Sequence, residues 1–161
     1  MASTHRGGWL IVLSIFLALV LTALPLPEPV AAWRPEWTAM VLVYWCLALP
    51  ERIGIGWSWF VGCLQDVLIG SALGAHGLAF AVAAFLTMRL YQRLRVFPVW
   101  QQALAVLVLL LLIRLLLFWI GGLLGRPSPG WTYWLPALTG TAVWPFIFVV
   151  LRNLRRRFGV C

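Results

Sequence analysis

The sequence predicts an all-α, polytopic membrane protein whose single domain (residues 1–161) contains six transmembrane helices. Hydrophobic residues make up 63% of the chain and charged residues only 10%, and the mean hydropathy is +0.98. Because an ionised group in hydrocarbon is costly, apolar blocks separated by charged joints indicate membrane spans. The predicted spans are 9–24, 35–49, 56–70, 74–91, 99–122 and 131–151.

The first block, 9–24, has two interpretations. It follows His5 and Arg6 and precedes the small pair Ala31–Ala32, as in a cleavable signal peptide. However, the joint after it is short and leads directly into another apolar block. We therefore expect the first block to be retained as a span.

The second and third blocks, 35–49 and 56–70, predict a short helical hairpin. At 1.5 Å per residue each is about 22 Å long, less than the roughly 30 Å of the hydrocarbon core. Pro50 and Gly54 mark the turn between them. Such a hairpin must thin the bilayer or be sheltered by other helices, and a re-entrant hairpin is the alternative.

Small residues recur at every fourth position along the third block and again on the fourth. Such ridges allow helix backbones to approach closely in lipid. We expect these two spans to form the tightly packed centre, and the fifth span to face lipid or another chain. The ridge residues are Gly54, Ser58, Gly62, Gly70 and Gly74, interrupted by Asp66, and then Ala75, Ala79 and Ala83.

The last two blocks are long. Block 99–122 is about 36 Å in length and should tilt, and Pro145 should kink block 131–151. Tryptophans lie near the predicted span ends, as interfacial anchors do; these are Trp33, Trp37, Trp57, Trp59, Trp100, Trp119, Trp131 and Trp134.

The arginines are divided unevenly between the two sides of the predicted membrane. The N-terminus, the second and fourth joints and the C-terminus hold nine, whereas the alternate joints hold only Arg34 and Arg126. The positive-inside rule then places both termini in the cytoplasm. Topology explains the basic tail, which could also contact anionic lipid or a cytoplasmic partner; its arginines are Arg152, Arg155, Arg156 and Arg157.

Asp66 and Arg114 are the charges inside the apolar blocks, apart from residues at block ends. A carboxylate at that depth must be neutralised, paired or hydrated. Arg114 and Arg34 are the two candidate partners, because both belong to the outer half. Asp66 either contributes to an outward-facing pocket for a ligand, proton or partner, or anchors the packing of helices. His76, at an outer joint, is expected to be solvated.

Catalysis and cofactor binding are not expected. The chain has no lysine, so a Walker-type nucleotide site is excluded. A single buried acid lacks the second carboxylate that most acid–base pairs and divalent-metal sites need. The three cysteines (Cys46, Cys63 and Cys161) form no metal or disulfide framework. The arginines that give the net charge of +8 are distributed according to membrane side, so a nucleic-acid partner is not expected.

Several motifs, taken together, resemble the MreD family of rod shape-determining membrane proteins over essentially the whole chain. The third block contains the most specific of them, a glycine-rich acidic motif around Asp66. The matching segments are 34–37, 44–50 with Arg52, 62–71 with Leu73 and Gly74, 100–103, 118–119 and 144–148.

The resemblance implies a non-catalytic scaffold of the bacterial inner membrane that binds the periplasmic scaffold MreC. It also implies links to MreB, RodA and a class B penicillin-binding transpeptidase. The family's fold resembles the S-components of energy-coupling-factor transporters, with a pocket open to the outside. The candidate pocket or partner-binding residues are Asp66, Arg34, Arg114, Gly62, Gly70 and Gly74. A small-molecule-binding or transport subunit of that type is the alternative function. A proton-coupled transporter is less favoured, because the chain has one buried acid and no inverted repeat.

Overall fold

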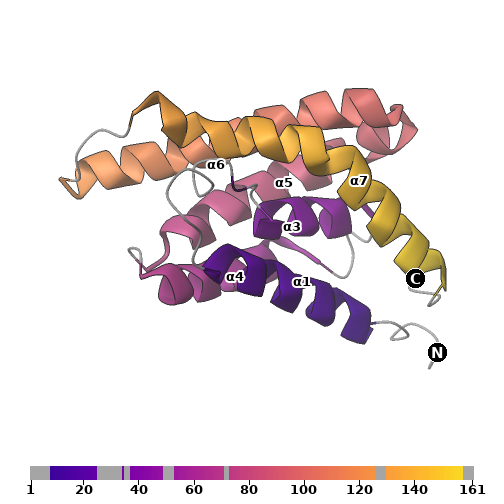
Figure 1. The fold of residues 1–161 in the computed structure, drawn as a ribbon, viewed down its shortest axis with the longest axis horizontal. Helices are drawn as coiled ribbons and strands as arrows, with labels where there is room; N and C mark the ends of the chain where they lie inside the picture. Colours follow the sequence, from indigo (N-terminus) through magenta and orange to yellow (C-terminus); the bar gives the residue numbers. More distant parts are fainter. Residues whose placement is uncertain are drawn as a thin grey trace.

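The computed structural model describes residues 8–24, 34, 37–48, 53–70, 73–125 and 130–157, which form six α-helices and one turn of 3-10 helix (Figure 1). The helices follow the predicted blocks closely. Only the fourth and sixth helices run more than one residue past their predicted blocks, because arginines that end an apolar block do not end a helix. The elements are α1 (Gly8–Ala23), α3 (Trp37–Ala48), α4 (Ile55–Ile69), α5 (Ala75–Val96), α6 (Val99–Leu123), η2 (Trp131–Trp134) and α7 (Leu135–Arg157).

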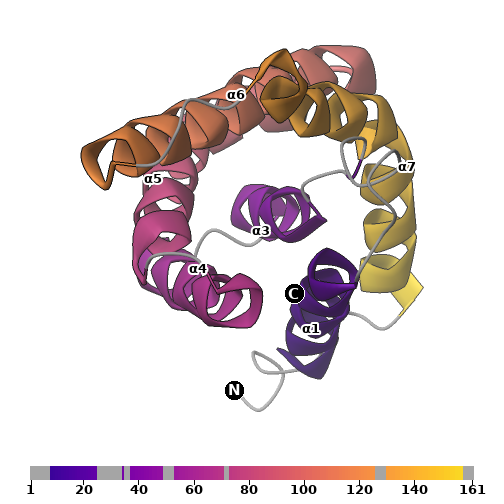
Figure 2. The ribbon, with the colours of Figure 1, turned by 60° about the vertical axis from the view of Figure 1, so that its left-hand side comes forward.

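Helix α3 lies in the middle of the bundle, and the other helices surround it (Figure 2). Every residue from Thr38 to Ala48 is buried, as expected for a helix that is apolar on all sides. The expectation that the third and fourth spans form the centre is therefore wrong. Helices α4 and α5 pack closely on each other but belong to the surrounding ring. Helix α3 is only about 18 Å long, and the other helices surround its sides (Figure 2).

The outside of the bundle carries many large apolar side chains. Helices α6 and α7 are long and apolar enough to cross a membrane. A monomer in water rarely exposes apolar patches of more than a few hundred Å², so this surface suits lipid. Large exposed side chains occur on every α-helix that surrounds α3; they include Trp9, Val12, Phe16, Trp57, Phe60, Val67, Leu78, Phe85, Leu104, Val108 and Phe146.

Helix α6 has one buried face and one exposed face. Leu110 and Ile113 are fully buried in the core, whereas Leu104 and Val108 are more than half exposed. Only one side of α6 is therefore exposed and able to face lipid or another chain, which stays a prediction, and the other side belongs to the core.

The start of α1 and the end of α7 lie at the same end of the bundle, on the right in Figure 1. Helix α7 contains Pro145 and changes direction along its length (Figure 1), as expected when a helical hydrogen bond is lost. The bend lets α7 follow the side of α3.

Candidate functional site

The joint between α4 and α5 is organised around Asp66. Helix α4 ends at Gly70, whose φ of 73° is left-handed and whose N–H donates to the backbone oxygen of Asp66. The chain returns through Gly74, which has a φ of 94° and precedes α5. The Asp66 carboxylate then accepts hydrogen bonds from the backbone N–H groups of Gly74 (2.9 Å) and His76 (3.1 and 3.2 Å). It thus caps α5 from a neighbouring helix and complements the positive end of the helix dipole.

His76 completes this cluster. Its Nδ1 lies 2.6 Å from Oδ1 of Asp66, within hydrogen-bond distance, and Nδ1 is the donor when the carboxylate is ionised. Asp66 is fully buried and His76 is 8% exposed. The expectation that His76 is solvated is therefore wrong. The signal in the sequence is the pair of glycines between the two residues, which allows the chain to turn back within ten positions.

Gly62 is the point of closest contact between α4 and α5. A Cβ atom at Gly62 would lie 2.5 Å from the Cα of Gly77, and one at Gly77 would lie 2.9 Å from Sγ of Cys63. The two backbones therefore touch directly, as small residues permit. Sequence reasoning missed Gly77, because it does not share the four-residue spacing.

The rest of the predicted ridge divides into two groups. Ser58 and Asp66 are fully buried, and so face the packed side with Gly62. At Gly54, Gly70 and Gly74 a Cβ atom would meet nothing within 4 Å. The packing role expected for these three glycines is therefore wrong, and Gly70 and Gly74 are needed for their left-handed backbone instead.

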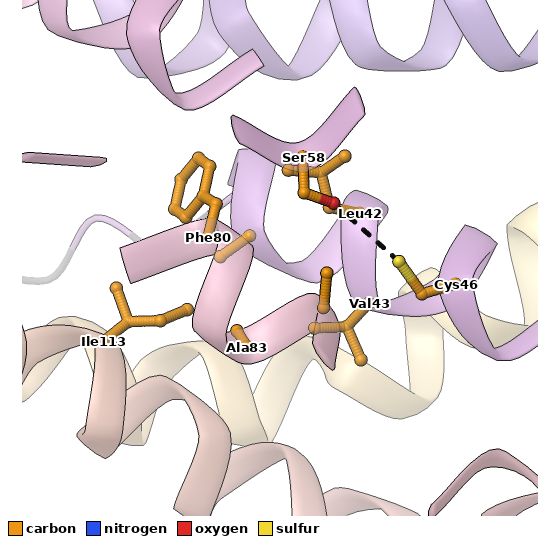
Figure 3. A pocket seen from close by; sticks show the side chains of 9 residues that line it. Leu42, Val43, Cys46, Ser58, Phe80, Ala83 and Ile113 are labelled. Carbon is orange, nitrogen blue, oxygen red and sulfur yellow. Dashed lines mark hydrogen bonds between the residues drawn. The ribbon is translucent and has the colours of Figure 1, made fainter. Parts of the chain in front are cut away.

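The alanines of α5 face the bundle core. Ala75, Ala79 and Ala83 are buried, and Ala83 helps to line a small internal cavity between α3, α4, α5 and α6 (Figure 3). There Sγ of Cys46 and Oγ of Ser58 are 3.9 Å apart. The cavity measures about 10 Å³, which is room for about one water molecule, so it is a packing defect and not a solute site.

The two arginines proposed as partners of Asp66 have their own described contacts. Arg34 donates to the backbone oxygens of Thr22 and Leu24, and so satisfies carbonyl groups at the C-terminal end of α1. The guanidinium of Arg114 lies 4.9 Å from the ring centre of Tyr133, whose hydroxyl donates to the Arg114 carbonyl. The contacts described for Asp66 come from the α4–α5 joint, so pairing with either arginine stays a prediction.

The basic end of α7 contains two kinds of arginine. Arg152 and Arg155 line a cavity between the ends of α3, α6 and α7, whereas Arg156 and Arg157 are exposed. Within the described ranges, no three His, Cys, Asp or Glu side chains are grouped so as to hold a metal ion. Cys46 and Cys63 are free thiols, and Cys161 lies outside the described residues.

Comparison with known proteins gives a consistent result over the length of the chain. The family described as rod shape-determining protein MreD matches residues 3–154. The chain is also 35% identical over 150 residues to the rod shape-determining protein MreD of Haemophilus influenzae, covering 92% of this chain and 93% of that protein. No solved structure matches the chain significantly.

Proposed function

Because the chain belongs to the MreD family of rod shape-determining proteins, we propose that it acts in rod shape determination as a non-catalytic scaffold of the inner membrane. In this proposal all six α-helices of the described residues cross or enter the bilayer as one domain, with both termini in the cytoplasm. The arrangement would correspond to that of the S-components of energy-coupling-factor transporters.

The observation that carries the proposal is the family match over nearly the whole chain, combined with an apolar exterior around a fully buried α3. In lipid no hydrophobic force draws helices together, so close packing and a few polar contacts must provide recognition. A scaffold of this kind acts by holding its own helices in a fixed arrangement, so that their outer surfaces can bind partner helices.

The proposed primary partner is MreC, whose single transmembrane helix would pack on the outside of the bundle. MreB, RodA and the class B transpeptidase would be reached directly or through MreC. The Asp66 cluster contributes by holding α4 and α5 in register. This role fits the observed geometry better than a solute pocket, because the carboxylate already accepts the N–H groups of the α5 turn.

Depletion of the chain in a rod-shaped host, followed by complementation, tests the proposal. We expect depleted cells to become spheres, and the wild-type chain to restore rods. Affinity purification from the complemented cells in mild detergent should enrich MreC. Rods that persist after complete depletion would reject the shape role, and a purification that enriches an ATPase module in place of MreC would favour the transport alternative.

A further inference from the structure

A second, larger cavity opens where the C-terminal ends of α3 and α7 meet the start of α6. It measures about 370 Å³, and its polar lining consists of Tyr44, Gln102, Arg152 and Arg155, with Leu47 and Phe148 on the apolar side. Sites for small molecules occupy roughly 300–1,000 Å³, so this cavity can hold more than a few water molecules. The three helix ends also belong to the side of the bundle that carries most of the arginines.

Two buried side chains that line this cavity each have a polar atom without a hydrogen-bond partner among the described residues. Tyr44 is 1% exposed and Gln102 is 3% exposed. The Gln102 Nε2 donates to the Leu94 carbonyl (2.8 Å), which fixes the amide. Within the described part of the chain, the Tyr44 hydroxyl and the Gln102 Oε1 have no hydrogen-bond partner. Leaving such groups unpaired is costly, so a bound group that supplies the missing partners would be favoured at this cavity.

The charge of the lining selects an anion. Arg152 and Arg155 both face the cavity, and among the residues described there no carboxylate lines it. The guanidinium of Arg152 lies 5.4 Å from the ring centre of Phe148, which restrains its position, and its Nε has no hydrogen-bond partner among the described residues. Arginine N–H groups and a tyrosine hydroxyl are suitable donors to phosphate oxygens.

The Gln102 Oε1 adds a second requirement, because an amide oxygen only accepts hydrogen bonds. A ligand that carries a hydrogen-bond donor, such as a hydroxyl, next to its anionic group satisfies both requirements. We propose that this cavity binds the phosphoglycerol headgroup of an anionic phospholipid from the cytoplasmic leaflet. The phosphate contacts Tyr44, Arg152 and Arg155, and a glycerol hydroxyl donates to Gln102. Basic pockets between membrane helices on the cytoplasmic side are suited to such headgroups.

Native mass spectrometry of the full chain in mild detergent, titrated with phosphatidylglycerol, tests the site. We expect the double variant Arg152→Gln/Arg155→Gln to bind this lipid at least about tenfold more weakly. The control Arg156→Gln/Arg157→Gln removes the same charge from exposed positions and should stay within about twofold. Equal losses in both double variants would mean diffuse attraction to a basic tail and would overturn the proposal.

Tyr44→Phe provides a milder test that removes one hydroxyl and keeps the ring packing. Its affinity should fall about three- to tenfold while its melting temperature changes little. Unchanged affinity in this variant would contradict the proposed phosphate position.

The hydroxyl contact and the source of the phosphate are tested by changing the ligand. Phosphatidylethanol, which has the same charge but no headgroup hydroxyl, should bind more weakly than phosphatidylglycerol, and Gln102→Met should abolish that difference. Soluble glycerol phosphate or an acidic peptide that binds as tightly as the lipid would overturn the lipid assignment. The lipid site requires only that the protein be embedded in a membrane. A failure of the proposed role in shape determination would therefore not contradict it.

Discussion

At Gly62, the α4 backbone lies against the α5 backbone at Gly77, and no room remains for a methyl group. The nearest atoms are main-chain atoms, which cannot move aside as a flexible side chain could. The contact therefore sets the distance between the two helices. Gly56 lies earlier on the same helix, about 1.7 turns before Gly62, and a Cβ atom there would meet nothing within 4 Å.

Gly62→Ala should destabilise the protein by about 1–3 kcal/mol, because the added methyl group forces the backbones apart. The matched change Gly56→Ala should be neutral or stabilising, since alanine is the better helix former. Thermal unfolding in mild detergent compares the two. A Gly62→Ala variant as stable as the wild type would mean that α4 and α5 can separate freely.

Asp66 and His76 act as one unit at the same joint. The carboxylate accepts a side-chain hydrogen bond and the N–H groups of the α5 turn. If either partner is removed, the other is left as a buried polar group without a hydrogen bond. Such a group destabilises the folded protein.

Asp66→Asn should cost about 1.5–3 kcal/mol, because an amide cannot accept with both of its terminal atoms. His76→Ala removes one of the same hydrogen bonds, so the double variant should cost less than the sum of the two single changes. Thr139→Ala on α7 removes a hydroxyl that bonds only within its own helix and should add independently to Asp66→Asn. Strict additivity of Asp66 and His76 in thermal unfolding would argue against a coupled pair.

At the scale of elements, α3 is the helix on which the others depend. Trp45 is fully buried, and its Nε1 donates to Oγ of Ser14 on α1 (2.8 Å). Thr38 is linked to Thr22 of α1 through their hydroxyls, 3.2 Å apart. These contacts join a very short helix to its neighbours, so that burial compensates for a length that does not span the bilayer alone.

Trp45→Ala should destabilise the bundle by about 3–5 kcal/mol, because it leaves a large cavity at the centre. Trp45→Phe keeps most of the ring and should cost less, including about 0.5–1.5 kcal/mol for the hydrogen bond to Ser14. Trp57→Ala on α4 is the control, since that side chain is 50% exposed and should matter little in detergent unfolding. Similar losses at Trp45 and Trp57 would contradict a central α3.

At the scale of the whole molecule, the distribution of arginines and the positions of the first and last helix ends both agree with the proposed topology, in which the two termini share one side. Nine of the twelve arginines fall in the N-terminus, the second and fourth joints and the C-terminus. The start of α1 and the end of α7 lie at one end of the bundle (Figure 1). An even number of membrane crossings, as proposed above, would account for both observations.

Reporter fusions at the two termini should both indicate the cytoplasm. Replacement of Arg152, Arg155, Arg156 and Arg157 together by glutamine should weaken this preference at the C-terminus, because the tail holds four of the nine arginines. A fusion at Arg126, in an alternate joint, should report the opposite side. Termini on opposite faces would contradict the six-span topology.

Three residues show how much of the candidate site could be predicted from the sequence: Gly62, Asp66 and His76. The four-residue spacing placed Gly62 and Ser58 on a packed face, and the isolated charge singled out Asp66. The same spacing wrongly grouped Gly70 and Gly74 with them, because periodicity within one helix cannot show where that helix ends. His76 and Gly77 were missed, because their partners lie on a different helix. His76 meets Asp66 only after the chain turns back through two left-handed glycines, and Gly77 meets Gly62 without sharing its four-residue spacing.

The amino-acid pattern by itself determined the all-helical class, the positions of the helices and the division of arginines between two sides, because these depend on local hydropathy and on the cost of charge in hydrocarbon. Only the tertiary structure decided which helix is central, which donors surround Asp66, and that Tyr44, Gln102, Arg152 and Arg155 share one cavity. Those relations join residues far apart along the chain, and the order of blocks in a sequence does not specify which faces meet in space.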